Sequence, residues 1–303
     1  MPDALDRLAA FDPLPAGRAG SPAPGAGRYV LLDVFTDRPL EGDQLAVFTN
    51  AAGIAAADMQ RLARELRLSE TVFMQPARGA GDVAIRIFTP EVELLFAGHP
   101  TLGAGVVAAS ALELDTVVLE TGMGEIEVRL KRERDHVVSG WMRQPIPSCA
   151  PYEHEPELLD ALGVARSELP VELYDNGPRH VYVALADSGA VAALRPDLQA
   201  LAALEVCVSC FAGAGRRWKT RMFAPAAGVP EDPATGSAAG PLALHLARHQ
   251  WIAFGSEIEI SQGREISRPS LLYALASGSA ERVESVEVGG SAVIVAGGEF
   301  LLG

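Results

Sequence analysis

Alternation of hydrophobic and polar residues predicts many short strands in this chain. Residues 83–88 (VAIRIF) show the pattern clearly, with every second side chain suited to a buried face. Strands are also predicted at residues 29–35, 46–48, 72–74, 117–120, 125–130, 136–142, 179–185, 205–211, 218–223 and 292–296, with further short strands from residue 257 onward. Because strands outnumber helices and follow one another through short turns, the pattern favours an α+β fold with mainly antiparallel sheets.

Helical spacing is found in fewer segments. Met59, Leu62 and Leu66 share one face of a predicted helix over residues 58–67, and residues 155–162 and 195–204 are also expected to be helical. Residues 242–248 (LALHLAR) predict an amphipathic helix that follows a run of small residues. This leaves about one long helix for each half of the chain.

One arrangement of residues occurs twice, 135 positions apart. RIFTP at residues 86–90 precedes FAGHPTLGAG at 96–105, and RMFAP at 221–225 precedes EDPATGSAAG at 231–240. Each copy consists of a strand, a proline, a short loop and a helix start rich in small residues. Since there is one copy in each half, the sequence predicts two similar halves and not a solenoid of several short repeats.

The two helix starts suggest where chemistry takes place. At the second one, Asp232 is expected to cap the helix and Pro233 to occupy its first turn. Unpaired N–H groups and the helix dipole favour an anion at such a position. Two helix starts facing one cleft would suit a small carboxylate substrate, or the enolate-like charge that develops during its reaction.

Prolines and glycines suggest the domain boundaries. Pro145, Pro147 and Pro151 are expected to mark a hinge between the halves. The predicted organisation is a flexible tail at residues 1–27, an N-terminal domain at 28–147 plus 292–303, and a C-terminal domain at 148–291. The tail lacks the apolar region of a secretion signal.

Composition narrows the classes of function. The 303 residues include 39 acidic and 25 basic side chains, a net charge of −14, which argues against nucleic-acid binding. No apolar run reaches membrane-spanning length. Cys149, Cys207 and Cys210 are too few for a disulfide framework, so a reducing cytoplasm is expected, with Cys207 and Cys210 as buried structural thiols.

Competing motifs are incomplete. His245 and His249 have the spacing of zinc ligands, but Leu246 replaces the glutamate of a zincin, so two partly exposed helix histidines are expected. The serine of GSAAG at 236–240 is one place too early for a nucleophile elbow. Glycine pairs at 213–215 and 122–124 lack the third glycine of a dinucleotide site. The sequence therefore predicts no metal and no cofactor.

Residue type alone leaves ordinary roles open for the candidate residues. Glu70 could be a solvated surface charge, Asp232 a plain helix cap, His99 a packing residue and Ser237 a small residue that allows close approach.

Five motifs together provide a stronger indication. They are SET at 69–71, FTP at 88–90, FAGHPTLG at 96–103, NGPRH at 176–180 and EDPATGSA at 231–238. From about residue 29 to its end the chain resembles the PhzF family of phenazine-biosynthesis isomerases. The resemblance implies a diaminopimelate epimerase-like fold: two pseudo-symmetric domains, each a sheet curled around a central helix, with the active site in the cleft.

The resemblance also implies roles for individual residues. Glu70 would be the general acid/base, with His99, Asp232 and Ser237 around it. Gly98 and Gly236 would present backbone N–H groups to the substrate carboxylate. Epimerase relatives carry a cysteine pair at the two helix starts, where this chain has His99 and Asp232, so two-thiol racemisation is not expected.

Two positions depart from the family pattern. EGDQ at 41–44 stands where family members commonly read EGNP, and Ser267 stands where glycine usually precedes Arg-Pro-Ser. The first change removes a proline and adds an acid to the expected pocket wall. The identity of the substrate is therefore left open.

The predicted function is a cofactor-independent isomerase that moves a proton across a small cyclic conjugated amino acid, trans-2,3-dihydro-3-hydroxyanthranilate in the phenazine case. The alternatives are an isomerase or hydrolase of another conjugated amino acid, and a non-catalytic binding protein. The intact Ser69-Glu70-Thr71 motif weighs against the last of these. The resemblance further implies a homodimer.

Overall fold

The computed structural model describes residues 7–8, 11, 26–133 and 136–301. The predicted flexible tail therefore lies mostly outside the described residues, although Ala26 and Gly27 already belong to the first strand. Contacts divide the chain into unit 1, Met1–Met142 with Gly290–Gly303, and unit 2, Arg143–Gly289.

The sheet of unit 1 is built mainly from antiparallel neighbours. In order across the sheet, its strands are the last part of β17 (Val283–Leu301), β1 (Ala26–Val34), β2 (Asp43–Phe48), β3 (Glu70–Gln75), β4 (Val83–Phe88), β6 (Thr116–Thr121), β7 (Gly124–Glu133) and β8 (His136–Gln144). The pairs β2–β3 and β4–β6 are parallel, and the short β5 (Glu93–Leu94) adds to β4.

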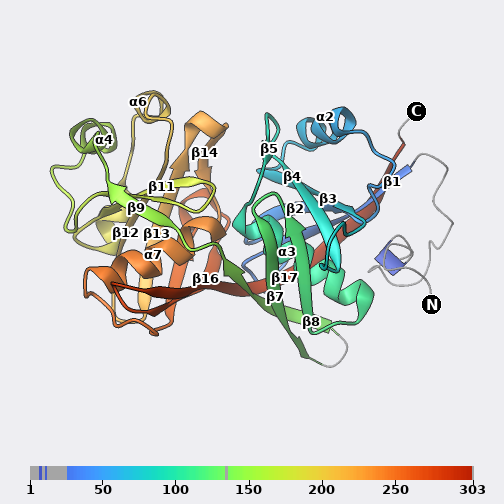
Figure 1. Cartoon of the computed structure of the whole chain (residues 1–303). Helices are drawn as coiled ribbons and strands as arrows, with labels where there is room; N and C mark the ends of the chain where they lie inside the picture. Colours follow the sequence, from blue (N-terminus) through green and yellow to red (C-terminus); the bar gives the residue numbers. More distant parts are fainter. Residues whose placement is uncertain (1–6, 9–10, 12–25, 134–135, 302–303) are drawn as a thin grey trace. The chain divides into compact units, whose positions relative to one another are not determined.

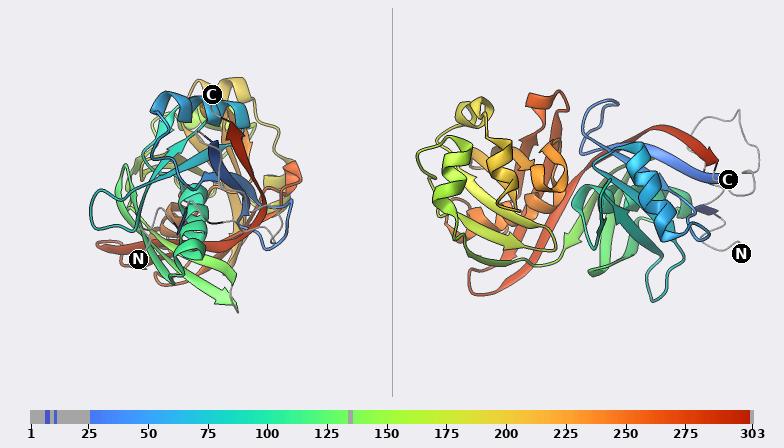
Figure 2. Two further views of the ribbon diagram at one scale, coloured as in Figure 1. Left: turned by 90° about the vertical axis from the view of Figure 1, so that its right-hand side faces the viewer. Right: turned by 90° about the horizontal axis from the view of Figure 1, so that it is seen from above.

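Helix α3 (Gly98–Leu112) forms the centre of unit 1 (Figure 1). It packs against β1, β2, β3, β4, β6 and β7, and every residue except Ser110 is buried. A helix that is apolar on all sides must be enclosed, because no face of it is suited to water. Helix α2 (Ala56–Leu66) lies outside this sheet and packs on β3 and β4 (Figure 2).

The sheet of unit 2 has its own set of strands. In order, they are β9 (Ser148–Pro151), β10 (Glu172–Asp175), β11 (Arg179–Ala184), β12 (Cys207–Ala214), β13 (Arg217–Ala224), β15 (Ile258–Gln262), β16 (Ser270–Gly278) and the first part of β17, with β14 (Val229–Asp232) added to β13. The helices are α4 (Glu155–Leu162), α5 (Ser188–Ala193), α6 (Leu198–Ala202) and α7 (Gly236–Arg248), with 3-10 turns η1 (Pro225–Ala227) and η2 (Arg264–Ile266).

The order of parallel and antiparallel pairs is the same in both units. In unit 2 the parallel pairs are β11–β12 and β13–β15, at the same places in the order as β2–β3 and β4–β6 in unit 1. The long helices also correspond, since α3 follows the short β5 and α7 follows the short β14. The repeat in the sequence is thus matched by a repeat in strand order.

Several predictions for local structure are confirmed and others are wrong. Strand β4 and helix α4 have the predicted bounds. The helix predicted over 195–204 is the five-residue α6, while α5, β9 and β10 had no clear pattern in the sequence. Strand β17 runs over 19 residues, far beyond the predicted 292–296. No helix among the described residues is long and apolar enough to cross a membrane.

Helix α7 corrects the prediction of an amphipathic helix. It begins at Gly236 and all its residues except Arg248 are buried. Asp232 is not its N-cap, because that position is taken by Thr235, and Pro233 precedes the helix instead of occupying its first turn. The small residues that precede Leu242 belong to the helix and allow it to be enclosed.

Ser267, one of the two departures from the family pattern, lies in the left-handed backbone region with φ of 61°. Glycine adopts this conformation more readily than other residues. The chain keeps the turn at Ser267 and accepts a backbone conformation that glycine would reach at lower cost.

Candidate active site

Glu70 is the first residue of β3, and its carboxylate is largely enclosed. The side chain is 16% exposed. Strand β3 runs parallel to β2 with Glu70 opposite Leu45, so that the first residues of both strands, Asp43 and Glu70, lie at the same end of the sheet. The surface-charge alternative for Glu70 does not fit this position.

His99, the second residue of α3, meets both carboxylates. Its Nδ1 lies 3.6 Å from Glu70 Oε2 and 3.1 Å from Asp43 Oδ2, and the Ser69 hydroxyl donates to Asp43 Oδ1 at 3.1 Å. Burial lowers the pKa of His99 to about 3, although a hydrogen bond with the backbone of Gln44 acts in the opposite direction. The imidazole is therefore neutral near pH 7 and carries one ring proton.

The position of that proton follows from the surroundings of the ring. Nε2 is buried and has no hydrogen-bond partner among the described residues. A buried N–H without a partner is costly, so the proton belongs on Nδ1, next to oxygen acceptors. His99 consequently donates from Nδ1, whose hydrogen bond is with the backbone of Gln44, and keeps a lone pair on Nε2.

Ser237, the second residue of α7, is held by two side chains of unit 2. His180 Nε2 lies 3.0 Å from Ser237 Oγ, and the Asn176 amide donates to the Ser237 carbonyl at 3.0 Å. Pro241 explains the second bond, because it lacks the N–H that would bond the Ser237 carbonyl inside the helix. Asn176 supplies the missing donor.

Asp232 ends β14 just before α7 and is 6% exposed. The Thr235 hydroxyl donates to Asp232 Oδ2. Gln262 donates from Nε2 to the Asp232 carbonyl at 2.9 Å and to Thr235 Oγ1 at 3.0 Å, and Thr220 donates to Gln262 Oε1 at 3.0 Å. The Asp232 carboxylate is thus fixed by a connected polar network instead of capping the helix itself.

Both long helices begin at the glycine expected to contact a carboxylate, Gly98 in α3 and Gly236 in α7. A helix N-terminus has a partial positive charge, which favours an anion. In α7, however, the Gly236 N–H lies 3.2 Å from the Ala234 carbonyl as a hydrogen-bond donor. An anion at this helix start would therefore have to compete for the Gly236 N–H.

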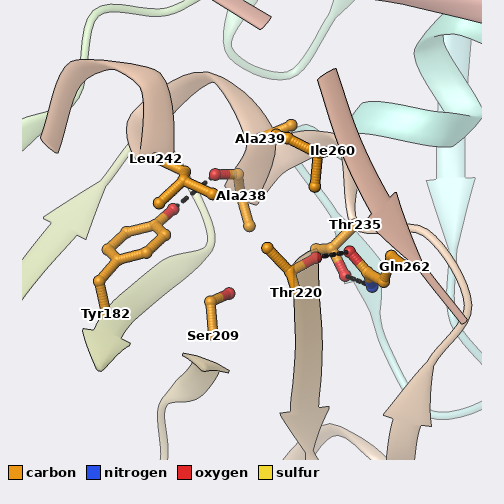
Figure 3. Close-up of a pocket in the computed structure, with 9 residues that line it drawn as sticks. All are labelled: Tyr182, Ser209, Thr220, Thr235, Ala238, Ala239, Leu242, Ile260 and Gln262. Carbon is orange, nitrogen blue, oxygen red and sulfur yellow. Dashed lines mark hydrogen bonds between the residues drawn. The ribbon is translucent and has the colours of Figure 1, made fainter. Parts of the chain in front are cut away.

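A small internal cavity lies behind the first turn of α7 (Figure 3). It has room for about one water molecule. Its walls include Tyr182, which donates to the Ala238 carbonyl, and Ser209, whose hydroxyl has no partner among the described residues. The cavity is too small for a substrate.

A larger hollow in unit 1, with a volume of about 450 Å³, is lined partly by the Arg86–Glu93 ion pair. Its lining includes neither Glu70 nor His99. The hollow therefore does not mark the predicted active site, which is identified from the contacts of Glu70 and His99.

One group of side chains has the composition of a metal site. Glu172 on β10 lies between His245 of α7 and His249, the residue that follows this helix, with 3.2 Å from Oε2 to His245 Nδ1 and 3.0 Å to His249 Nε2. Tyr174 donates to the same oxygen at 2.8 Å, and an Arg248 nitrogen lies 3.7 Å away. Glu172 is thus the centre of a hydrogen-bonded group.

Two observations argue against a cation in this group. The positive charge of Arg248 would repel one, and a metal-bound His245 would need an acceptor for its Nε2–H, which is not found among the described residues. The expectation of two partly exposed histidines holds for His249 but is wrong for His245, which is fully buried.

The cysteines follow the structural expectation in part. Cys210 is buried and burial raises its pKa to about 12, whereas Cys207 is half-buried and Cys149 is exposed. All three are free thiols.

The predicted site residues fall into two groups. Unit 1 contains Gly98, His99 and Glu70, with His99 and Glu70 in contact, while unit 2 contains the other three, Asp232, Gly236 and Ser237.

Sequence reasoning missed two partners of these residues. Asp43 was noted only as a change in the pocket wall, and His180 only as a letter of the NGPRH motif. The position of His180 at the start of an alternating strand could have drawn attention to it. Its partner Ser237 could not have been found in this way, because it lies 57 residues further along the chain.

Comparison with known proteins places these residues in a wider context. A family model described as phenazine biosynthesis-like protein matches residues 32–298. The chain is 50% identical over 275 residues to trans-2,3-dihydro-3-hydroxyanthranilate isomerase of Pseudomonas chlororaphis, covering 90% of this chain and 99% of the relative.

Solved structures show the same fold. A PhzF-family phenazine biosynthesis protein from Bacillus anthracis superposes with a TM-score of 0.80 at 22% identity, covering 91% of this chain and 99% of the other. A hydroxyproline epimerase from Agrobacterium vitis, with bound trans-4-hydroxy-L-proline, gives a TM-score of 0.62 at 12% identity over 92% and 93% of the two chains.

Proposed function

Because this chain belongs to the phenazine biosynthesis-like protein family, we propose that it is a trans-2,3-dihydro-3-hydroxyanthranilate isomerase in which Glu70 moves the proton. The relative with this activity in its name is 50% identical and is covered almost completely. The observation that carries the role of Glu70 is its enclosed carboxylate next to a neutral, buried histidine. Such a group can exchange a proton with a substrate away from bulk water.

The reaction needs one group that acts first as base and then as acid. Glu70, as carboxylate, takes the proton from the carbinol carbon of the substrate and returns it at the far end of the diene. The product is an enol that tautomerises to an aminoketone. General acid/base catalysis of this kind contributes on the order of 10²–10⁴ in rate.

The remaining candidate residues hold the substrate. In unit 1 the start of α3 at Gly98, and in unit 2 the start of α7 at Gly236 with the Ser237 hydroxyl, each suit an anionic group of the substrate, and charge that develops during proton transfer is stabilised by such helix starts. His99 offers the lone pair of Nε2 to an N–H or O–H group of the substrate. Asp232, which Thr235 and Gln262 hold by hydrogen bonds, has the role of orienting the substrate or directing the proton.

The same proposal extends to the architecture. Matched strand orders and matched long helices support two pseudo-symmetric domains of the diaminopimelate epimerase type, each with a curled sheet around its helix. A homodimer and a cytoplasmic location stay predictions, and light scattering on the purified protein measures the first of them.

The decisive experiment replaces Glu70 by Gln, which keeps the size and removes the proton-carrying group. We expect turnover of the dihydroanthranilate to fall by at least about 10²-fold. Glu65, exposed on α2, gives the matched control, and Glu65→Gln should leave turnover unchanged. Activity of Glu70→Gln within a few-fold of the unsubstituted protein would remove Glu70 from the mechanism.

Incorporation of solvent deuterium separates the proposal from its alternatives. Incorporation into trans-2,3-dihydro-3-hydroxyanthranilate that depends on Glu70 supports the isomerase. Exchange with other conjugated amino acids alone would indicate a different substrate. This alternative is considered because the buried Asp43 lies beside His99. Tight binding without exchange would indicate a binding protein.

A further inference from the structure

The contact between Ser237 and His180 permits two opposite uses of the serine. If His180 Nε2 accepts the hydroxyl proton, Ser237 becomes a nucleophile, as in hydrolases. If Nε2 donates to Ser237 Oγ, the hydroxyl proton stays free for a bound ligand. The distance of 3.0 Å is compatible with both, so the choice depends on the ring proton of His180.

The surroundings of His180 decide where this proton lies. The residue is 1% exposed, and burial lowers its pKa to about 3, so the ring is neutral. Its Nδ1 is buried and has no hydrogen-bond partner among residues 26–133 and 136–301. A proton on Nδ1 would create a buried, unpaired N–H, whereas a bare lone pair there is tolerated more easily.

We propose that His180 is a positioning residue that donates from Nε2 to Ser237 Oγ and thereby fixes the Ser237 hydroxyl as a donor to the substrate carboxylate. No other hydrogen bond of this hydroxyl is found in the described part of the chain. The carboxylate as ligand rests on the proposed function, but the direction of the His180–Ser237 bond does not.

The backbone of Ser237 is fixed by a separate contact. The Asn176 amide occupies the carbonyl that Pro241 leaves unpaired. Two buried side chains of unit 2 thus orient Ser237. His180, which is 1% exposed, holds the hydroxyl, and Asn176, which is 2% exposed, holds the carbonyl. This double support matches the needs of a precisely placed hydrogen-bond donor.

The nucleophile alternative lacks a necessary part. A histidine that acts as base toward serine is oriented by an acceptor for its other ring N–H. At His180 that position is Nδ1, where no acceptor is found in the described chain. The same arrangement therefore argues against the hydrolase alternative considered from the sequence.

The direct test is the tautomer of His180, measured by ¹⁵N NMR of the histidine-labelled protein without substrate. The His180→Phe variant identifies the signals by their loss. We expect a protonated Nε2 and a bare Nδ1. A protonated Nδ1 would overturn the proposal. The tautomer is read from the unsubstituted protein without substrate, so a different substrate does not affect it, and loss of the same signals in His180→Gln confirms the assignment.

Kinetics provide a second readout. His180→Phe should raise KM about tenfold, the effect expected for one misplaced hydrogen bond to a charged group, with kcat changed much less. His180→Gln, which retains an N–H donor, should recover part of the loss. His249→Gln, at the residue that follows α7 and outside this contact, is the control and should keep the KM. Equal KM values in all three variants would contradict the positioning role.

A serine-directed fluorophosphonate tests the nucleophile directly. Mass spectrometry should find Ser237 unmodified. Modification of Ser237 that disappears in His180→Phe would show that His180 activates the serine, and the proposal would fail.

Discussion

Asn176 and Pro241 should be energetically coupled through the Ser237 carbonyl. The Asn176 amide donates to this carbonyl at 3.0 Å in a buried environment, because Pro241 has no N–H to offer. Removing the amide in Asn176→Ala leaves a buried carbonyl unpaired, which costs about 1–3 kcal/mol. In Pro241→Ala the new N–H at position 241 can bond the same carbonyl, so the loss of Asn176 should cost at least about 1 kcal/mol less there.

The assay is urea unfolding of the four proteins of this double-mutant cycle. Trp218 and Trp251 are stacked in unit 2 and report its unfolding, and a Trp141→Phe background removes the tryptophan of unit 1. This separation is needed because chains with two domains commonly depart from two-state unfolding. The exposed Gln199 of unit 2 supplies the control, and Gln199→Ala should change stability by less than about 0.5 kcal/mol. The reasoning would be refuted if Asn176→Ala lowered the unfolding free energy by the same amount with proline at position 241 as with alanine there.

Two further outcomes follow from burial. His99 and His180 have folded pKa values of about 3 against an ordinary 6.5, so the unfolded chain binds more protons below pH 6.5, and each should lower the unfolding free energy by about 1 kcal/mol between pH 6 and 5. Urea titrations of His180→Phe should show a correspondingly smaller loss, and an unchanged loss would contradict this. Gly103→Ala would bring a Cβ too close to Leu45 Cδ2 and should cost about 1–3 kcal/mol, whereas Gly53→Ala, with no atom within 4 Å of the added Cβ, should be nearly neutral in the same measurement.

Local patterns predicted the elements whose surroundings are simple. Strand β4 alternates cleanly and α4 has helical spacing with a proline in its first turn, and both have the predicted bounds. Helix α7 was misjudged because small residues do not reveal which faces are buried. Strand β17 was underestimated because its 19 residues pair with β16 in unit 2 and with β1 in unit 1.

The site shows the same division between local and distant information. The glycines at which α3 and α7 begin were found from motifs, because a helix start is set by residues close in sequence. The approach of Asp43 to His99 depends on the packing of β2 against α3, and that of His180 to Ser237 on the placement of β11 beside α7. Such contacts join residues 56 and 57 positions apart, and no periodicity in the sequence encodes them.

The three buried histidines follow one rule with different consequences. His99, His180 and His245 each have one buried nitrogen without a partner in the described chain, and burial lowers the pKa of each. The single ring proton must then lie on the other nitrogen, which faces carboxylates in His99 and His245 and a hydroxyl in His180. His99 donates from Nδ1, which bonds the backbone of Gln44 and lies 3.6 Å from Oε2 of Glu70, the proposed base. His180 donates to Ser237, which leaves a hydroxyl proton available for an anion.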